Sequence, residues 1–272
     1  MVTIASAVEI ESSLIEVAAT ARDKTNAERK SIWVSPRTVW KYTNKIITGI
    51  TNVNIPASVT TRGMTLTVSS IKESAFEGET DILSVSFVNS PMTIVPKDAF
   101  KDCTNLNQVE LSNTLETIEA GAFDGCPIDS LIIPASIKTV GEKSLSNVRK
   151  IEIVNSNEPI SFSDAIPTIT SAFIGRNITQ SFLSKSSVST VSFGIGITEI
   201  IPSMFEGCKQ IQEISIPANI IKIGDNAFNG CEQLTRFRIE DSDSVLALGK
   251  TSIWTDREIR NTYGYALHVS YQ

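Results

Sequence analysis

The chain has 272 residues, 41% of them hydrophobic, and 30 acidic against 24 basic side chains give it a formal net charge of −6. This length and apolar content predict a folded protein with a large core and not a disordered one. The acidic balance argues against nucleic-acid binding. No apolar run is long enough to cross a bilayer as a helix, so no membrane insertion is expected.

Residues 1–48 precede the repeated pattern described below and are expected to form a separate N-terminal segment or cap. The opening residues lack the basic region of a secretory signal. Residues 7–30 fit either a helix or strands, and the alanine-rich stretch 15–22 favours a helix. The β-branched and aromatic residues of 33–47 predict one or two strands that continue the sheet.

A short apolar–x–apolar phrase recurs along the middle of the chain, with starts 19 to 24 residues apart. Such alternation is typical of a half-buried strand. The phrases are Val85–Phe87, Val109–Leu111, Leu131–Ile133, Ile151–Ile153, Ala172–Ile174, Val191–Phe193, Ile214–Ile216 and Phe237–Ile239, preceded by a less regular member at Val53–Ile55. Self-similarity at this period predicts a stacked array of repeats.

Two further apolar positions follow most strand phrases: an aliphatic anchor, and a phenylalanine five or six residues after it. The anchors are Ile71, Ile94, Ile118, Val140, Ile200 and Ile223, and the phenylalanines are Phe76, Phe100, Phe123, Phe205 and Phe228, with Leu145 standing in once. We expect these positions to form inward columns from one turn to the next.

Four of the phenylalanines are followed three residues later by a cysteine, at Cys103, Cys126, Cys208 and Cys231. The cysteines lie 23 residues apart within each pair, and 82 residues separate Cys126 from Cys208. Because stacked side chains point the same way and a disulfide needs converging ones, we expect reduced, buried packing positions. Neither CxxC nor CxxH spacing occurs, so no zinc site is expected.

These patterns predict one repeat solenoid over residues 49–241, a right-handed coil of about nine turns with parallel strands stacked at roughly 4.8 Å. The expected class is mainly β, with a short helical or irregular convex side. Proline directly follows the strand phrase at Pro56, Pro134 and Pro217, where its missing amide donor ends the ladder. Residues 242–272 are expected to form a C-terminal cap.

The repeat units resemble a known family. The segments Ile216–Cys231 and Leu115–Cys126 are similar to the BspA-type leucine-rich repeat, and the resemblance extends over about residues 50–241. Units between Leu145 and Phe182 depart from it, because they lose the cysteine and the glycine before it. The resemblance implies a leucine-rich-repeat fold in a cell-surface or secreted protein that engages host matrix proteins or other cells.

The sequence offers little for catalysis. His268 is the single histidine and is expected to be a tail or cap residue. No GxSxG elbow accompanies a serine, and Gly194-Ile195-Gly196 lacks the third glycine of a dinucleotide cradle. We therefore expect no enzymatic activity, no cofactor and no metal site.

The large aromatic side chains with polar tips all lie outside the repeats. They are Trp33, Trp40, Trp254, Tyr42, Tyr263, Tyr265 and Tyr271. We expect them to build the caps that the ends of a solenoid require. The alternative is an aromatic platform that binds a sugar or a peptide at one end.

The residues beside and between the inward pairs of each strand should face outward. They are Ser84, Ser86, Gln108, Glu110, Ser130, Ile132, Lys150, Glu152, Ser171, Phe173, Thr190, Ser192, Glu213, Ser215, Arg236 and Arg238, and most are polar. Ile132 and Phe173 are apolar exceptions two turns apart, on either side of Lys150. They form a candidate contact patch unless flanking loops cover them, and Arg236 and Arg238 add charged candidates on the same face.

The leading interpretation is a non-enzymatic binding or adhesion module that presents its stacked strands to a protein or cell-surface macromolecule. It rests on regular repeats, the missing catalytic constellation and a long face of mixed polarity. Two alternatives stay open. The first is that the array is a structural or self-assembling surface spacer. The second is that it is a glycan-binding unit that uses the terminal aromatics.

Overall fold

The computed structural model describes residues 31–34, 51–61, 64–240, 246–249 and 259–261. These residues form strands, turns and irregular segments, and none of the connections among them is helical. Of the two forms expected for the convex side, the irregular one is therefore present. The expectation for 7–30 lies outside the described residues, as do most of 33–47 and 242–272.

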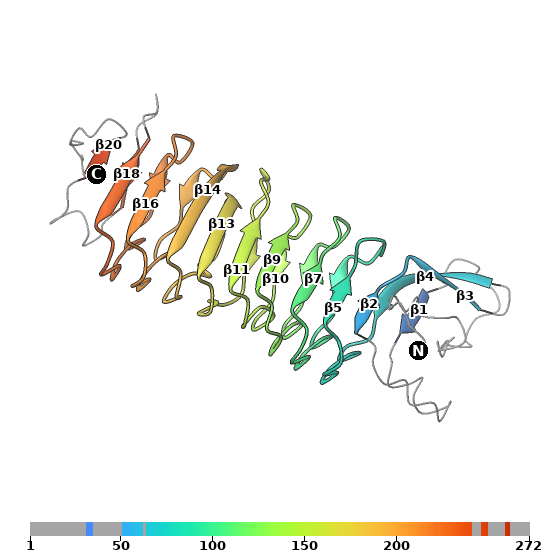
Figure 1. Ribbon diagram of the computed structural model, residues 1–272. Helices are drawn as coiled ribbons and strands as arrows, with labels where there is room; N and C mark the ends of the chain where they lie inside the picture. Colours follow the sequence, from blue (N-terminus) through green and yellow to red (C-terminus); the bar gives the residue numbers. More distant parts are fainter. Residues whose placement is uncertain (1–30, 35–50, 62–63, 241–245, 250–258, 262–272) are drawn as a thin grey trace, which may run out of the picture. The chain divides into compact units, whose positions relative to one another are not determined.

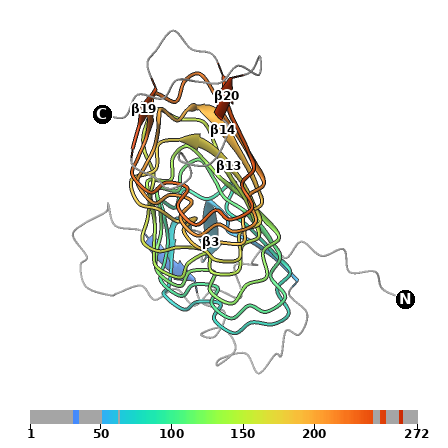
Figure 2. The same cartoon turned by 90° about the vertical axis from the view of Figure 1, so that its left-hand side faces the viewer.

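The described chain falls into two units, each built of strands stacked in parallel (Figure 1). The first unit is Met1–Asp129 with Gly141–Leu145, and the second unit is Ser130–Val140 with Ser146–Gln272. Figure 2 looks along the stacks, so the traces of successive turns within a unit lie over one another. Each turn contributes one longer strand to a main sheet, and most turns add a two-residue strand to a second, narrower sheet.

In the first unit the main sheet is parallel and in register. It consists of β2 (Asn52–Asn54), β5 (Ser84–Ser86) and β7 (Gln108–Glu110). The narrower sheet contains β6 (Ile94–Val95) and β8 (Thr117–Ile118). A further three-stranded sheet is formed by β1 (Ser31–Val34) parallel to β4 (Met64–Ile71), with β3 (Ser58–Thr61) antiparallel to β4. The chain between β2 and β5 is therefore occupied by a hairpin.

In the second unit the main strands form two parallel groups. One is β9 (Ser130–Ile133), β11 (Lys150–Ile153), β13 (Ser171–Arg176) and β14 (Thr190–Gly196), and the other is β16 (Glu213–Ile216), β18 (Arg236–Ile239) and β20 (Ile259–Asn261). The narrower strands are β10 (Thr139–Val140) with β12 (Ser161–Phe162), and β15 (Glu199–Ile200) with β17 (Lys222–Ile223) and β19 (Ala247–Leu248). All nine strand phrases identified in the sequence overlap main-sheet strands of the two units.

The strands form a solenoid of about seven turns in the described residues, and the expected number of nine was too high. The nine strand phrases enclose eight intervals, since a turn joins two strands. The first interval, from β2 to β5, is 32 residues long because it holds the β3–β4 hairpin. Seven regular intervals remain.

Aromatic rings stack from turn to turn inside each unit. In the first unit the centroids of Phe76 and Phe100 are 4.8 Å apart and those of Phe100 and Phe123 are 5.5 Å apart, with nearly parallel rings. In the second unit the corresponding distance between Phe205 and Phe228 is 5.1 Å. Since these separations match the strand spacing, the phenylalanines form the expected inward columns.

One anchor was assigned one residue too early. Ile94 is 42% exposed, whereas its neighbour Val95 is fully buried. Val95 is the register partner of Ile118, so it occupies the inward column in this turn. Both residues are β-branched and apolar, which is why the sequence pattern did not distinguish them.

The recurrence of glycine directly before the cysteine is explained by its backbone conformation. In three of the four cysteine units this residue has a positive φ, +77° at Gly125 and +72° at both Gly207 and Gly230. The fourth unit uses Asp102, with φ of 57°. A left-handed residue is needed at this point of each turn, and glycine adopts that conformation without steric cost.

The four cysteines are buried and free, as expected. Each thiol donates a hydrogen bond to the main-chain carbonyl of the preceding turn: Cys103 to Phe76, Cys126 to Phe100, Cys208 to Leu183 and Cys231 to Phe205, at 2.9 to 3.1 Å. A hydrogen bond with Cys103 and burial raise the pKa of the Cys126 thiol well above its ordinary value, and burial raises the pKa of Cys208. The cysteines therefore act as small buried donors that link adjacent turns.

The stretch without cysteines has its own packing. Between Cys126 and Cys208, the rings of Phe162 and Phe182 stack with their centroids 4.1 Å apart. Arg176 is fully buried, and its guanidinium donates to the carbonyls of Ala135 at 2.7 Å and Pro134 at 3.0 Å. Burial lowers the pKa of Arg176. This side chain joins β13 to the exit of β9, two strands away in the sheet.

Candidate binding surfaces

The outward strand face follows the alternation expected from the sequence. Every one of the sixteen residues predicted to face outward is at least partly exposed, while inward partners such as Val85, Leu131 and Ile214 are buried. In a solenoid this face is formed by side chains that the core does not use. It holds the candidate binding residues and is described unit by unit.

In the second unit, the two apolar exceptions stand in one row across the sheet. Ile132 is 55% exposed, and Phe173 is half-buried. Glu152 is the register partner of both, so it lies directly between them. Lys150, predicted to lie between them, stands instead in the neighbouring row with Ser130 and Ser171. Lys150 and Glu152 share one face of β11, and only the strand register decides which of them flanks the apolar pair.

Phe173 is half-buried because it lies against a glycine. A side chain at Gly194 would come within 2.9 Å of the ring atom Cζ of Phe173, and would also overlap Oδ1 of Asn155. That same oxygen accepts a hydrogen bond from the amide of Ile195 at 2.9 Å. The bare glycine thus leaves room for the Phe173 ring on the sheet, and Ile132 remains the more exposed member of the pair.

Arg236 and Arg238 share one carboxylate. Nε of Arg236 is 3.1 Å from Oε2 of Glu213, and Nε of Arg238 is 3.4 Å from Oε1 of the same residue. Both arginine side chains are more than half exposed. Ion pairs of this exposure contribute little to stability, in the range of about 0–1 kcal/mol. The arginines are therefore available to a partner at small cost.

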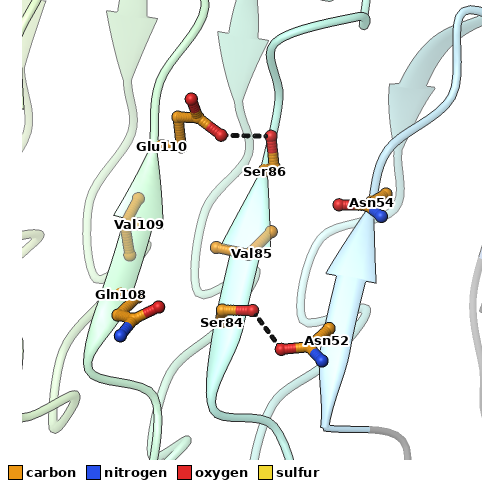
Figure 3. Close-up of a pocket in the computed structure, with 8 residues that line it drawn as sticks. All are labelled: Asn52, Asn54, Ser84, Val85, Ser86, Gln108, Val109 and Glu110. Carbon is orange, nitrogen blue, oxygen red and sulfur yellow. Dashed lines mark hydrogen bonds between the residues drawn. The ribbon is translucent and has the colours of Figure 1, made fainter. Parts of the chain in front are cut away.

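In the first unit, the outward face of β2, β5 and β7 is hollowed into a concavity of 440 Å³. Two rows of polar side chains line it, with Val85 and Val109 between them (Figure 3). We call them the first row, Asn52, Ser84 and Gln108, and the second row, Asn54, Ser86 and Glu110. Each row runs straight across three strands, because the strands pair without a shift in register.

Hydrogen bonds within the rows hold some of these side chains in place. Oγ of Ser84 donates to Oδ1 of Asn52 at 2.5 Å, and Oγ of Ser86 donates to Oε2 of Glu110 at 2.9 Å (Figure 3). Glu110 carries the single formal charge of the eight lining residues. The concavity is therefore a polar surface with one negative charge.

Sequence reasoning did not find this concavity. It placed Ser84, Ser86, Gln108 and Glu110 on the outward face but treated them as ordinary solvated residues, and it read the strand of Asn52 and Asn54 only as an irregular repeat. These three strands have hydrogen-bonding residues at both outward positions, but β14, β16 and β18 share this feature, so it does not single out a hollow. What the sequence does not show is that the side chains of the two rows lie around one hollow.

Several expected features lie outside the described residues. These include His268 and all the tyrosines and tryptophans except Trp33, of which only the backbone is described. The expected aromatic caps and the alternative aromatic platform therefore lie outside the described side chains. In the described part of the chain, no helix is long and apolar enough to cross a membrane.

The stacked parallel strands, the phenylalanine columns and the repeated glycine–cysteine turn define a leucine-rich-repeat solenoid. The chain belongs to the BspA-type leucine-rich repeat family, whose repeat model matches in six copies over residues 69–180 and 160–251. This match confirms the resemblance seen in the repeat units and includes the divergent stretch between Leu145 and Phe182.

Solved leucine-rich repeat proteins from several bacteria are similar to the chain. One from T. pallidum is 17% identical, with 87% of this chain and 83% of that one covered and a TM-score of 0.40. One from Bacteroides ovatus is 15% identical, covering 75% and 84%, with a TM-score of 0.39. A leucine-rich cell surface protein from Faecalibacterium prausnitzii is 20% identical, covering 74% and 87%, with a TM-score of 0.32. No curated protein matches the chain.

Proposed function

We propose that the protein is a non-enzymatic binding module that engages a protein partner through the outward strand face of its second unit. The observation that carries this proposal is the row Ile132–Glu152–Phe173. An isoleucine that is 55% exposed on the outward face of a strand has no role in the core. Exposed apolar side chains surrounded by polar ones are typical of protein interaction sites.

The surroundings of this row fit a protein partner. Lys150 and Glu152 offer one charge of each sign on the same strand, and hydroxyl groups of Thr190 and Ser192 follow on β14. An apolar centre with a polar rim is the usual arrangement of such an interface. Membership of the BspA-type family supports a location at the cell surface or in the secreted fraction, where extracellular-matrix proteins of a host are candidate partners.

The test compares two exposed isoleucines of the same unit. Binding of the wild type to a panel of purified extracellular-matrix proteins identifies a partner, and affinities are then measured for Ile132→Asp and for the control Ile221→Asp. Ile221 is 48% exposed but stands just before β17, on the narrower sheet. Burial of an isoleucine in an interface contributes about 1.5–3 kcal/mol, so Ile132→Asp should weaken binding at least tenfold.

The control should change affinity less than twofold. If no matrix protein binds the wild type, or if Ile132→Asp binds as tightly as Ile221→Asp, this interface is wrong. Thermal unfolding of both variants shows whether each remains folded.

A further inference from the structure

The concavity of the first unit presents a different chemistry from the apolar row of the second unit. All six outward side chains of β2, β5 and β7 are hydrogen-bonding groups. Each row starts with an asparagine, has a serine hydroxyl at its centre, and ends in Gln108 or Glu110. A site lined in this way favours a ligand that is itself covered with hydrogen-bonding groups.

The amides decide what kind of polar ligand fits. An asparagine or glutamine side chain offers both donors and an acceptor, and a sugar hydroxyl likewise donates one hydrogen bond and accepts others. Neighbouring strands separate the groups of a row by roughly 4.8 Å, and the two rows are roughly 6.6 Å apart along the strands. Groups at these separations can reach hydroxyls on different carbon atoms of one sugar ring or of two linked rings.

The serines set the geometry of the rows. Because Ser84 donates to Asn52 and Ser86 donates to Glu110, the acceptor oxygens of both partners are already oriented before a ligand arrives. Side chains ordered in advance lose less conformational freedom on binding. The volume of 440 Å³ also falls within the range of small-ligand sites.

The charge of the lining and the pairing of the strands argue against three other kinds of ligand: an anion, a polycation and an extended peptide. Glu110 is the only charged lining residue, so an anionic ligand is repelled and a polycationic one finds a single partner. The central strand β5 is paired on both edges, by β2 and by β7, so an extended peptide cannot add a strand at the centre of the concavity. We propose that this concavity binds a neutral oligosaccharide through the amides of Asn54 and Gln108 and the carboxylate of Glu110.

This site is independent of the proposed protein interface, since it lies in the other unit and uses other residues. Its test begins with the full chain on an array of neutral, sulfated and sialylated glycans. The best neutral oligosaccharide is then titrated by calorimetry against Asn54→Ala/Gln108→Ala and Glu110→Gln. The matched control is Glu158→Gln, which removes an exposed carboxylate of the second unit.

We expect the double variant to weaken oligosaccharide binding at least tenfold, Glu110→Gln to weaken it about tenfold or less, and Glu158→Gln to leave it unchanged. Binding should persist in 0.5 M NaCl, because screening affects charge pairs and not neutral hydrogen bonds. The proposal is overturned if no neutral glycan binds, or if the double variant binds as the wild type does. A preference for oligolysine that is lost in Glu110→Gln and in salt overturns it in favour of a cationic partner.

Discussion

At the scale of the residue, the recurrence of cysteine at the same position of the repeat has a physical reason. A small apolar residue would fill the same space, but only the thiol also donates to the carbonyl of the preceding turn, as Cys126 does to Phe100 at 3.0 Å. The thiol must stay protonated to donate. Its raised pKa shows that the folded state favours the neutral form.

This preference predicts a pH dependence of stability. The folded pKa of Cys126 is raised above the unfolded value of about 8.5, so the unfolded state loses its proton first as the pH rises. The contribution of this thiol is full below pH ~8.5 and is lost above it, by up to ~1.4 kcal/mol per pH unit. Urea unfolding from pH 7 to 10 should show this decline, and Cys126→Ala should decline less steeply.

The same variant also has a cost at neutral pH. Cys126→Ala removes a hydrogen bond from a buried carbonyl and should lower the free energy of unfolding by about 1–3 kcal/mol. Equal slopes for wild type and variant above pH 8.5 would contradict the role given to the thiol.

Single residues also mark where sequence reasoning succeeded and where it stopped. The inward phenylalanines and cysteines were predicted because the fold repeats the same environment at each turn. Ile94 was confused with Val95 because two adjacent β-branched residues fit one inward position equally well. Glu152 was missed as the neighbour of Ile132 because the prediction used only the alternation of faces. The aligned strand phrases already place Ile132, Glu152 and Phe173 at the same middle position, and the register of the strands follows that alignment.

At the scale of the element, β13 and β14 depend on a close approach of their backbones. A Cβ atom at position 194 would lie within 2.9 Å of both Cα of Gly175 and the ring of Phe173, so only glycine fits there without displacing a neighbour. Gly194→Ala should displace the ring and the Asn155 amide, and lower the free energy of unfolding by about 1–3 kcal/mol. Chemical denaturation measures this loss, and Ser192→Ala, an exposed position on the same strand, is the control with little expected change.

The element scale also shows why the interface could be predicted only in part. The outward positions of each strand were predicted by alternation alone. The half-burial of Phe173 arises from Asn155, which lies in the divergent stretch between Leu145 and Phe182, and from Gly194 on the strand that follows this stretch. The polar concavity arises from three regular strands acting together, and no single strand reveals it. If Gly194→Ala proved as stable as Ser192→Ala, the packing account of Phe173 would fail.

At the scale of the whole molecule, a solenoid whose turns contact their neighbours should tolerate the loss of one full turn. Excision of residues 206–228 removes 23 residues, one period, and joins Phe205 to Asn229, so that the phrase Phe-Asn-Gly-Cys is restored at the junction. Cys231 then takes the position of Cys208, whose thiol donates to the carbonyl of Leu183 at 2.9 Å. The ring stack between Phe205 and Phe228 is lost, so stability should fall while the fold persists.

The matched control excises residues 206–217, about half a period, which sets the following strand phrase out of step with the turn before it. Circular dichroism and thermal unfolding of both variants test the expectation. The one-period excision should keep the β spectrum and a cooperative transition at a lower Tm, and the half-period excision should lose both. Similar behaviour of the two variants would mean that the period does not govern stacking. The separation between them is expected because a register error moves inward side chains to the outward face, whereas a missing turn removes one set of contacts.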